Sequence, residues 1–305
     1  RRDLAPRPDR GVALQTAGSS AEQAFGGGAL ARWVLAKAGL EAAHYRVRPL
    51  SRRSAACLRA LRVPSEEAAR TLLERQPALL DTALDSLLLG VTEFFRDPPV
   101  FEVLRGRLPA LAASTAGSRS LRIWSLSCSI GCELYSIGIL LAEAGLLAGT
   151  DLLGTDCRKQ PLVQAREGLY PQTLVAAIEP GLRARHFDAA GDCRRVREPL
   201  RSQVQWRQED LFARDTAAEE WDMIFWRNTA IYLDPAAASS VWSRLARALR
   251  PGGLLVTGKA ERPGPVGHLR RVAASVYIKA EADPDDCCRA LEPAGRGATT
   301  MEPAE

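Results

Sequence analysis

The chain of 305 residues contains no long hydrophobic run, few aromatic residues and only three histidines. No stretch approaches the roughly 18 consecutive apolar residues of a membrane-spanning helix, so we expect no membrane span. The opening sequence, RRDLAPRPDRG, lacks the apolar segment that an export signal contains. The seven cysteines are scattered along the chain, which favours reduced thiols in a cytoplasmic protein over a disulfide framework.

Metal and nucleic-acid sites also lack their usual residues. Cys128 and Cys132 are four residues apart, but no second pair or clustered histidine completes a zinc site, so we expect no bound metal. The glycine pattern of a dinucleotide site, G-x-G-x-x-G, is absent as well. Arginines crowd residues 46–62 without aromatic residues between them to stack on bases, so nucleic acid is not the expected partner.

What remains is the composition of a globular protein, with 46% apolar and 25% charged residues. Residues 1–20 have no periodicity and are expected to be flexible. Residues 21–90 have helical spacing, whereas residues 91–282 alternate strands with helices. Residues 283–305 lose their apolar content and are expected to form a disordered tail. The sequence therefore predicts a small all-helical domain followed by an α/β domain.

Caps and apolar spacing define the expected elements. Ser65 is a helix cap, followed by two acidic residues at the positive end of the helix dipole. Helices of the first domain are expected from the capping box Ser20-x-x-Gln23 to Lys37, after Pro49, after Ser65 and from Ala78 to Leu89. A mostly parallel sheet is expected in the second domain, with strands at 121–125, 151–156, 222–226, 254–258 and 274–280. Helices of that domain are expected from Glu133, over Gln160–Glu167 and from Pro235.

The stretch Leu121–Leu141 predicts a strand, a turn of small residues and a helix, which is typical of the first βα turn of an open α/β sheet. Ligands of such sheets lie at the carboxyl ends of the strands. Asp156 ends the second strand, where its carboxylate can accept hydrogen bonds from two ribose hydroxyls; a helix cap is the alternative. Because pyrophosphate needs backbone approach at more than one point, S-adenosylmethionine fits this turn better than a dinucleotide.

Five segments of the chain carry distinctive patterns, in this order: TEFFR (92–96), WSLSCSIGCELYS (124–136), TDCRKQPLVQAREGLY (155–170), WDMIFWRNTAIYL (221–233) and LRPGGLLVTGKAE (249–261). Together, over about residues 25–281, they resemble the CheR-type methyltransferases, which methylate glutamates on chemotaxis receptors. The resemblance implies a Rossmann-like domain that uses S-adenosylmethionine, with a small helical N-terminal domain before it. It also implies a short β-subdomain, inserted at about residues 185–204 ahead of the central strand.

The resemblance assigns roles to individual residues. The positions that match cofactor-contacting residues of the family are Thr92, Arg96, Glu133, Asp156, Asp210, Leu211, Arg227 and Asn228. Arg96 and Tyr232 match the residues beside the transferred methyl group. A glutamate carboxylate is ionised at neutral pH and is itself the nucleophile, so no catalytic His or Cys is needed. Taken without the family, Arg96 has a simpler interpretation, a surface ion pair with Asp97.

The expected partners are the acidic cytoplasmic helices of methyl-accepting chemoreceptors. Arg52 and Arg53 match receptor-facing positions of the family, and their positive charge suits an acidic helix. A solvated helix face is the alternative interpretation of these arginines. The segment Asp188–Val196 is shorter than the loop of family members that tether to a receptor peptide, so no tethering is expected, and we expect a monomer.

The sequence departs from the family pattern at several positions: Cys132 replaces the first glutamate of a GEE triplet, Gly90 a common asparagine, Trp226 a cysteine, Asp210 an asparagine, and Lys259-Ala260 a His-Ser pair. The chain is therefore identified as a divergent member. Two alternatives stay open: a catalytically weak relative that acts as a binding or regulatory module, and a methyltransferase with a different acceptor.

Overall fold

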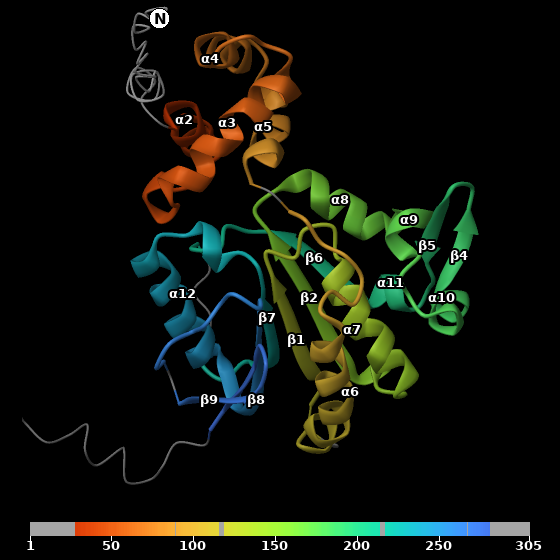
Figure 1. Cartoon of the computed structure of the whole chain (residues 1–305). Helices are drawn as coiled ribbons and strands as arrows, with labels where there is room; N and C mark the ends of the chain where they lie inside the picture. The colour runs from red at the N-terminus through yellow and green to blue at the C-terminus, as the bar shows by residue number, and fades with distance from the viewer. Residues whose placement is uncertain (1–27, 89, 116–118, 214–216, 267, 281–305) are drawn as a thin grey trace, which may run out of the picture.

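The computed structural model describes residues 28–88, 90–115, 119–213, 217–266 and 268–280. The flexible segment predicted at 1–20, the capping box at Ser20 and the tail predicted at 283–305 lie outside the described residues. Figure 1 shows two units, a helical one at the N-terminal end and a larger α/β one below it. No helix in the described ranges is long and apolar enough to cross a membrane.

Over residues 28–88, the N-terminal unit has four α-helices packed around one apolar cluster: α2 (Ala29–Lys37), α3 (Val47–Leu61), α4 (Glu66–Arg75) and α5 (Leu80–Leu87). The Ser65 hydroxyl accepts a hydrogen bond from the Ala68 N–H at 3.1 Å, which confirms the predicted cap. Helix α3 begins two residues before Pro49, because a proline in the first turn removes no intrahelical hydrogen bond. Helix α5 is shorter than expected, since Pro77–Leu79 forms a 3-10 turn instead.

The larger unit is built on a sheet with the strand order β6-β2-β1-β7-β8-β10-β9. Its strands are β1 (Leu121–Leu126), β2 (Thr150–Asp156), β6 (Val204–Gln208), β7 (Trp221–Trp226), β8 (Leu249–Thr257), β9 (Leu269–Ala273) and β10 (Val276–Lys279). The five strands from β6 to β8 are parallel, which confirms the predicted Rossmann-like α/β class. The strand predicted at 274–280 is present as β10, but it begins after a turn at Ser275 (φ +61°) and pairs antiparallel with β9, which was not predicted.

Alternating side chains divide the sheet between two apolar cores. Ile123 and Phe225 face the core under α6 (Pro98–Ala113) and α7 (Cys132–Glu143). Trp124 and Trp226 face the opposite core, which is covered by α12 (Pro235–Ala248). Helix α8 (Lys159–Glu167) follows β2 and packs on the α7 side. The buried rows of both faces explain why β1 and β7 are almost continuously apolar.

A second, three-stranded sheet lies between α8 and β6 in the chain, in the order β3-β5-β4. Its strands are β3 (Leu169–Pro171), β4 (Phe187–Ala190) and β5 (Cys193–Val196), with the short helices α9 (Gln172–Val175), α10 (Pro180–His186) and α11 (Leu200–Gln203) around them. The sheet begins earlier than the expected insert at 185–204, because the three-residue β3 is too short to show alternation. Asp188–Val196 forms a hairpin with only Gly191 and Asp192 between its strands.

The helical unit is fastened to the larger unit by backbone hydrogen bonds. The Arg46 N–H donates to the Tyr232 carbonyl at 2.9 Å, and the Asp234 N–H donates to the His44 carbonyl at 2.8 Å. Tyr45 and Leu233 form an antiparallel bridge between these bonds. The N-terminal unit is thereby held over the end of the sheet at which β1, β2 and β7 finish (Figure 1).

Candidate functional site

A cavity of about 390 Å³ lies between the helical unit and the carboxyl ends of β1, β2 and β7. Most residues that the sequence singled out line it together: Arg52, Arg53, Thr92, Arg96, Glu133, Asp156, Leu211, Arg227, Asn228 and Tyr232. Asp210 does not line the cavity; its carboxylate accepts the Phe212 N–H at 3.3 Å instead. The structure therefore brings together segments that are more than 100 residues apart in the chain.

The turn after β1 is bent tightly onto the end of β2. Ser127 and Ser129 have φ values of +58° and +52°, which few residues other than glycine adopt. This conformation lets the Ser129 N–H donate to Asp156 Oδ2 at 2.8 Å and the Cys128 N–H donate to the Thr155 carbonyl at 2.9 Å. Gly131 follows at φ +84°, where a Cβ atom would lie 2.5 Å from the Trp206 ring. The small residues of this turn thus serve a close approach of two strand ends.

Glu133 lies in the first turn of α7, where the helix dipole favours a carboxylate. Its Oε1 accepts a hydrogen bond from the Ser125 hydroxyl at 2.9 Å, and its Oε2 accepts one from Arg227 Nη1 at 3.1 Å. Because each carboxylate oxygen can accept two hydrogen bonds, each keeps one acceptor position for a ligand.

Arg227 is the buried cation of the site, with 3% of its side chain exposed. Besides Glu133, it donates to Asp97 Oδ2 at 2.6 Å and to the Arg96 carbonyl at 2.9 Å. Its role in the structure is therefore to join the β7 end, the α7 start and the TEFFR segment. Although it lines the cavity, most of its donors are already used by the protein.

Asp97 does not pair with Arg96, so the simpler interpretation of Arg96 is wrong. Lys259 reaches Asp97 Oδ1 at 2.6 Å, and Arg227 occupies Oδ2. Burial raises the pKa of Asp97, but the hydrogen bond from Lys259 and the charge of Arg227 outweigh it, so the pKa lies below its usual value. Arg96 Nη1 donates to the Val91 carbonyl at 2.8 Å, which leaves other guanidinium N–H groups for the cavity.

Asn228 is held in a left-handed conformation (φ +59°) by a buried carboxylate that sequence reasoning did not single out. Glu261, 5% exposed, accepts the Asn228 N–H at 2.7 Å and the Gly258 N–H at 2.8 Å. Burial raises the pKa of Glu261, and the backbone hydrogen bonds oppose that rise. The sequence feature that could have indicated this role is an acidic residue shortly after the end of the apolar strand β8.

Tyr232 lines the cavity from the 3-10 turn Ala230–Tyr232. Its hydroxyl has no hydrogen-bond partner among the residues that the structure describes, so it is available to a ligand. Tyr45, which the sequence did not point to, lines the same cavity from the helical unit. Burial raises the pKa of Tyr45, which therefore remains a neutral phenol.

Asp156 is 4% exposed and accepts hydrogen bonds mainly from one neighbour, Arg158. The Arg158 N–H and Nε–H donate to Oδ1 at 3.0 Å each, and Nη2 donates to Oδ2 at 3.2 Å. The sequence analysis expected either a ribose ligand or a helix cap at this carboxylate. In the structure Asp156 accepts the N–H of Arg158, the N-cap residue of α8, and its other positions are covered by the Arg158 guanidinium and by the Ser129 N–H. Arg158 was not predicted as a site residue.

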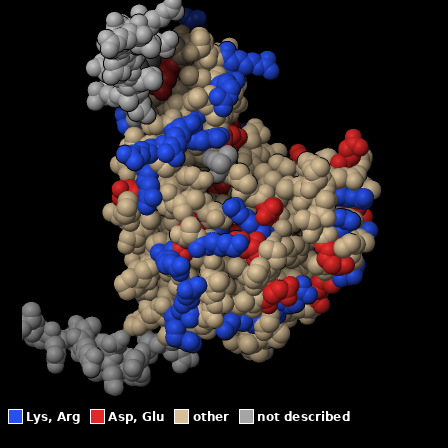
Figure 2. Space-filling view, viewed as in Figure 1, with Lys and Arg blue, Asp and Glu red and all other residues tan. Residues whose placement is uncertain are grey.

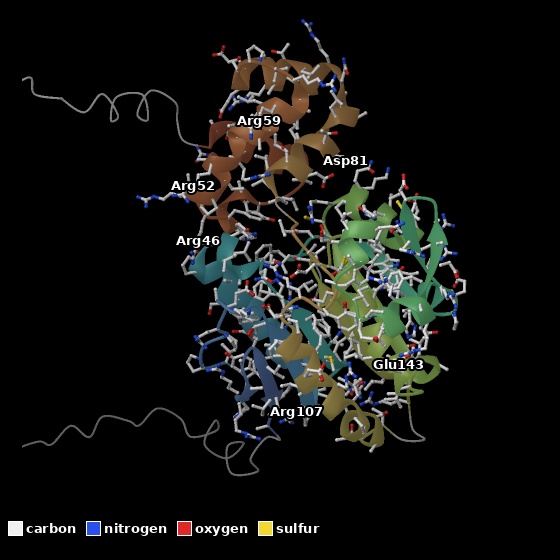
Figure 3. All side chains as sticks on the ribbon, turned by 45° about the vertical axis from the view of Figure 1, so that its right-hand side comes forward. Arg46, Arg52, Arg59, Asp81, Arg107 and Glu143 are labelled. Atoms are coloured by element: carbon white, nitrogen blue, oxygen red, sulfur yellow. The ribbon has the colours of Figure 1, made fainter. Side chains whose placement is uncertain are left out.

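The two arginines predicted to face a receptor differ in their environment. Arg53 donates from Nε and Nη2 to the Ser86 carbonyl, at 3.0 and 2.8 Å, and so joins α3 to α5. Arg52 is exposed and extends away from the molecule in Figure 3, whereas the Nε of Arg46 nearby donates to the Leu233 carbonyl at 2.8 Å. Figure 2 shows Lys and Arg side chains over the helical unit and along the face below it. Arg52 is therefore more accessible to a partner than Arg53, which is half-buried.

Residues 90–275 match the sequence model of the CheR methyltransferase, SAM binding domain. The chain belongs to the CheR methyltransferase family. The matched domain binds S-adenosylmethionine, which is the cofactor that Asp156 and the small-residue turn after β1 had predicted. No group of three or more His, Cys, Asp or Glu that could hold a metal occurs in the described part of this CheR-family chain.

Curated relatives agree with the family. The chain is 35% identical over 246 residues to chemotaxis protein methyltransferase 2 of Pseudomonas aeruginosa, covering 76% of this chain and 83% of that protein. It is 32% identical over 231 residues to the probable biofilm formation methyltransferase WspC of Pseudomonas putida, covering 72% of this chain. The chain thus spans only 54% of the length of that relative.

Likeness to solved structures is low. A S-adenosylmethionine-dependent methyltransferase from Mesorhizobium loti aligns over 50% of this chain and 52% of that one, with 19% identity and a TM-score of 0.27. The Rossmann-like fold of this CheR-family chain is shown by its own strand order, β6-β2-β1-β7-β8-β10-β9.

The cavity suits S-adenosylmethionine in its donor set. Glu133 offers carboxylate acceptors to the ammonium group of the methionine end, and Leu211, Leu126 and Tyr45 offer apolar surface to an adenine ring. Arg96 adds donors for a carboxylate. One residue of the set is already engaged, because the Asp156 carboxylate is covered by Arg158.

Proposed function

We propose that the chain transfers a methyl group from S-adenosylmethionine to glutamate side chains of chemoreceptor-type proteins and so forms γ-methyl esters. The observation that carries this proposal is the cavity itself, which all of the family-matched site residues except Asp210 line together. The names of the chemotaxis and biofilm methyltransferase relatives support the same class of reaction.

Little acid–base chemistry is required of the protein. Bound S-adenosylmethionine supplies a methyl group on a positively charged sulfur, which keeps the electron pair of the broken C–S bond and becomes a neutral thioether. The acceptor carboxylate forms the new O–CH₃ bond, and no proton changes place. The work of the site is therefore in-line placement and exclusion of water.

Three side chains of the cavity suit that work. Glu133 holds the methionine ammonium group with its two remaining acceptor positions. Arg96 directs its free N–H groups at the acceptor carboxylate, and Tyr232 adds a hydrogen bond from its hydroxyl beside the methyl group. The helical unit, through Tyr45 and α3, covers the cavity and limits its contact with water.

An acidic helix of a receptor would dock beside the mouth of this cavity. Arg46, Arg48 and Arg52 are exposed there at the start of α3. Val47 and Val91, 50% and 66% exposed, add apolar contact area. Such a partner places the enzyme in the cytoplasm, where receptor signalling helices lie, and a single copy of the chain is sufficient for the cavity.

The test is methyl transfer from radiolabelled S-adenosylmethionine to the cytoplasmic fragment of a chemoreceptor. We expect incorporation that is released as methanol by mild base, because esters are base-labile and methylated amines are not. Tyr232→Phe should lower the rate about tenfold by removing one hydrogen bond near the methyl group, while binding of S-adenosylhomocysteine persists. Base-stable incorporation would indicate a different acceptor, and absence of incorporation with intact binding would indicate a regulatory module.

A further inference from the structure

The Asp156 carboxylate has no acceptor position left for a ribose. Oδ1 receives the Arg158 N–H and Nε–H, and Oδ2 receives the Ser129 N–H and Arg158 Nη2. A carboxylate accepts about four hydrogen bonds, and these four use that capacity. The hydroxyls of a ribose can therefore reach Asp156 only if the Arg158 guanidinium leaves it.

The same guanidinium holds the helical unit. Its Nη1 donates to the Leu88 carbonyl at 2.9 Å and lies 3.8 Å from Asp85 Oδ1, both at the end of α5. Only 9% of the Arg158 side chain is exposed. One side chain thus connects the end of β2 with the end of α5 across the cavity.

Because Gly90 has no Cβ atom, the Arg158 guanidinium can lie against its backbone. A Cβ atom at Gly90 would lie 2.5 Å from Arg158 Nη2 and 2.6 Å from the Ser129 hydroxyl, closer than real contacts allow. The backbone of Gly90 also accepts a hydrogen bond from the Ser129 hydroxyl at 3.1 Å. A residue larger than glycine at position 90 would clash with the Arg158 guanidinium where it now lies. The position of Arg158 therefore depends on Gly90.

We propose that Arg158 competes with the cofactor's ribose for Asp156 and thereby makes cofactor affinity depend on the contact between α5 and the Rossmann-like domain. This inference rests on the proposed function, because it requires S-adenosylmethionine to place its ribose at Asp156. Hydrogen bonds between ions are stronger than those from a neutral hydroxyl to a carboxylate, so displacing Arg158 weakens binding. Displacement also releases the Leu88 carbonyl, which loosens the helical unit.

The experiment measures binding of S-adenosylhomocysteine by calorimetry and thermal unfolding of the ligand-free chain. In Arg158→Ser, Asp156 becomes free for the ribose, so affinity should rise about tenfold, or ~1.4 kcal/mol. The ligand-free variant should unfold at a lower temperature, because it loses the Leu88 and Asp156 contacts. Lys159→Ser is the matched control: it removes the same charge from an exposed neighbouring position and should change neither quantity.

Opposite movement of affinity and stability is the distinguishing result, since a merely structural role for Arg158 would lower both. If Arg158→Ser does not fold, Arg158→Lys decides the question, because a single ammonium group covers less of the carboxylate and affinity should still rise. If the unmodified chain binds S-adenosylhomocysteine and the variants bind it equally or more weakly, Arg158 does not compete with the ribose. The proposed function is unaffected by that result. No binding by any of these proteins overturns both.

Discussion

Arg227 stabilises the floor of the cavity through two carboxylates at once. It is paired with Asp97 and Glu133, and its Nε donates to the Thr257 carbonyl at 3.3 Å. The side chains of Arg227, Asp97 and Glu133 are all little exposed, so water solvates them poorly when an ion pair among them is broken. Removing one member of a buried ion network leaves uncompensated charge, which costs far more than the net contribution of the pair.

We therefore expect Arg227→Met to lower the free energy of unfolding by about 3 kcal/mol, measured by urea denaturation at neutral pH. Arg105→Met is the control, because Arg105 pairs with Glu102 at 3.7 Å with more than half of both side chains exposed. The control should lose less than about 1 kcal/mol. Similar losses in the two variants would mean that the network under the cavity is not a stabilising feature.

At the scale of elements, patterns of apolar residues predicted those helices and strands that bury one apolar face in a core. The strands β1, β2 and β7, the cap at Ser65 and the helix start at Pro235 lie where the sequence places them. Strand β9 of the C-terminal hairpin and the short strand β3 were not predicted, because neither has enough residues to establish a period. Local spacing carries no information about such pieces, whose positions depend on neighbours far away in the chain.

The small sheet is tied to the main domain by an ionic contact at the end of α7. Glu143 accepts hydrogen bonds from Arg185 Nη2 at 2.6 Å and from His186 Nε2 at 2.8 Å, the latter when that nitrogen is protonated. The hydrogen bond from Arg185, with a further one from His186, lowers the pKa of Glu143 to about 2. Figure 3 shows Glu143 at the base of this region.

Because the folded pKa of Glu143 lies below the unfolded one, its contribution is complete above about pH 4.5 and is lost as the pH falls toward 2. We expect Glu143→Gln to reduce stability at pH 6 by at most about 1 kcal/mol, since the group is partly exposed, and to leave stability at pH 2 unchanged. Unfolding in urea at both pH values measures this. An equal loss of stability at both pH values would show that Glu143 does not act through the negative charge of its carboxylate.

At the scale of the whole molecule, the sequence predicted which residues meet but not how their donors are used. Arg53 was expected to face a receptor, yet it binds Ser86 within the helical unit. Asp156 was expected to bind a ribose or to cap a helix, yet the Arg158 guanidinium covers much of its carboxylate. Motifs show which residue types occur together, whereas the partners of a guanidinium depend on the backbone carbonyls and carboxylates that the fold brings near.

The proposed docking of a receptor helix at the start of α3 can be tested by reversing the charge of Arg52. Arg52→Glu should slow methylation of a receptor fragment about five-fold at low salt, because rim charges act on encounter, while binding of S-adenosylhomocysteine stays the same. Arg59→Glu is the matched control on the same helix, exposed but remote from the cavity (Figure 3). Equal rates for the two variants would show that the start of α3 does not contact the receptor. Arg53→Glu should instead lower the melting temperature.

We propose that S-adenosylmethionine binds across the ends of β1 and β2, between Glu133 and Asp156. Calorimetric titration with S-adenosylhomocysteine, repeated with Asp156→Ala, tests it most directly. We expect one binding site per chain and weaker binding by the variant, which lacks the ribose acceptor. No binding by the unmodified chain at high micromolar concentration, or equal binding by both proteins, would contradict it.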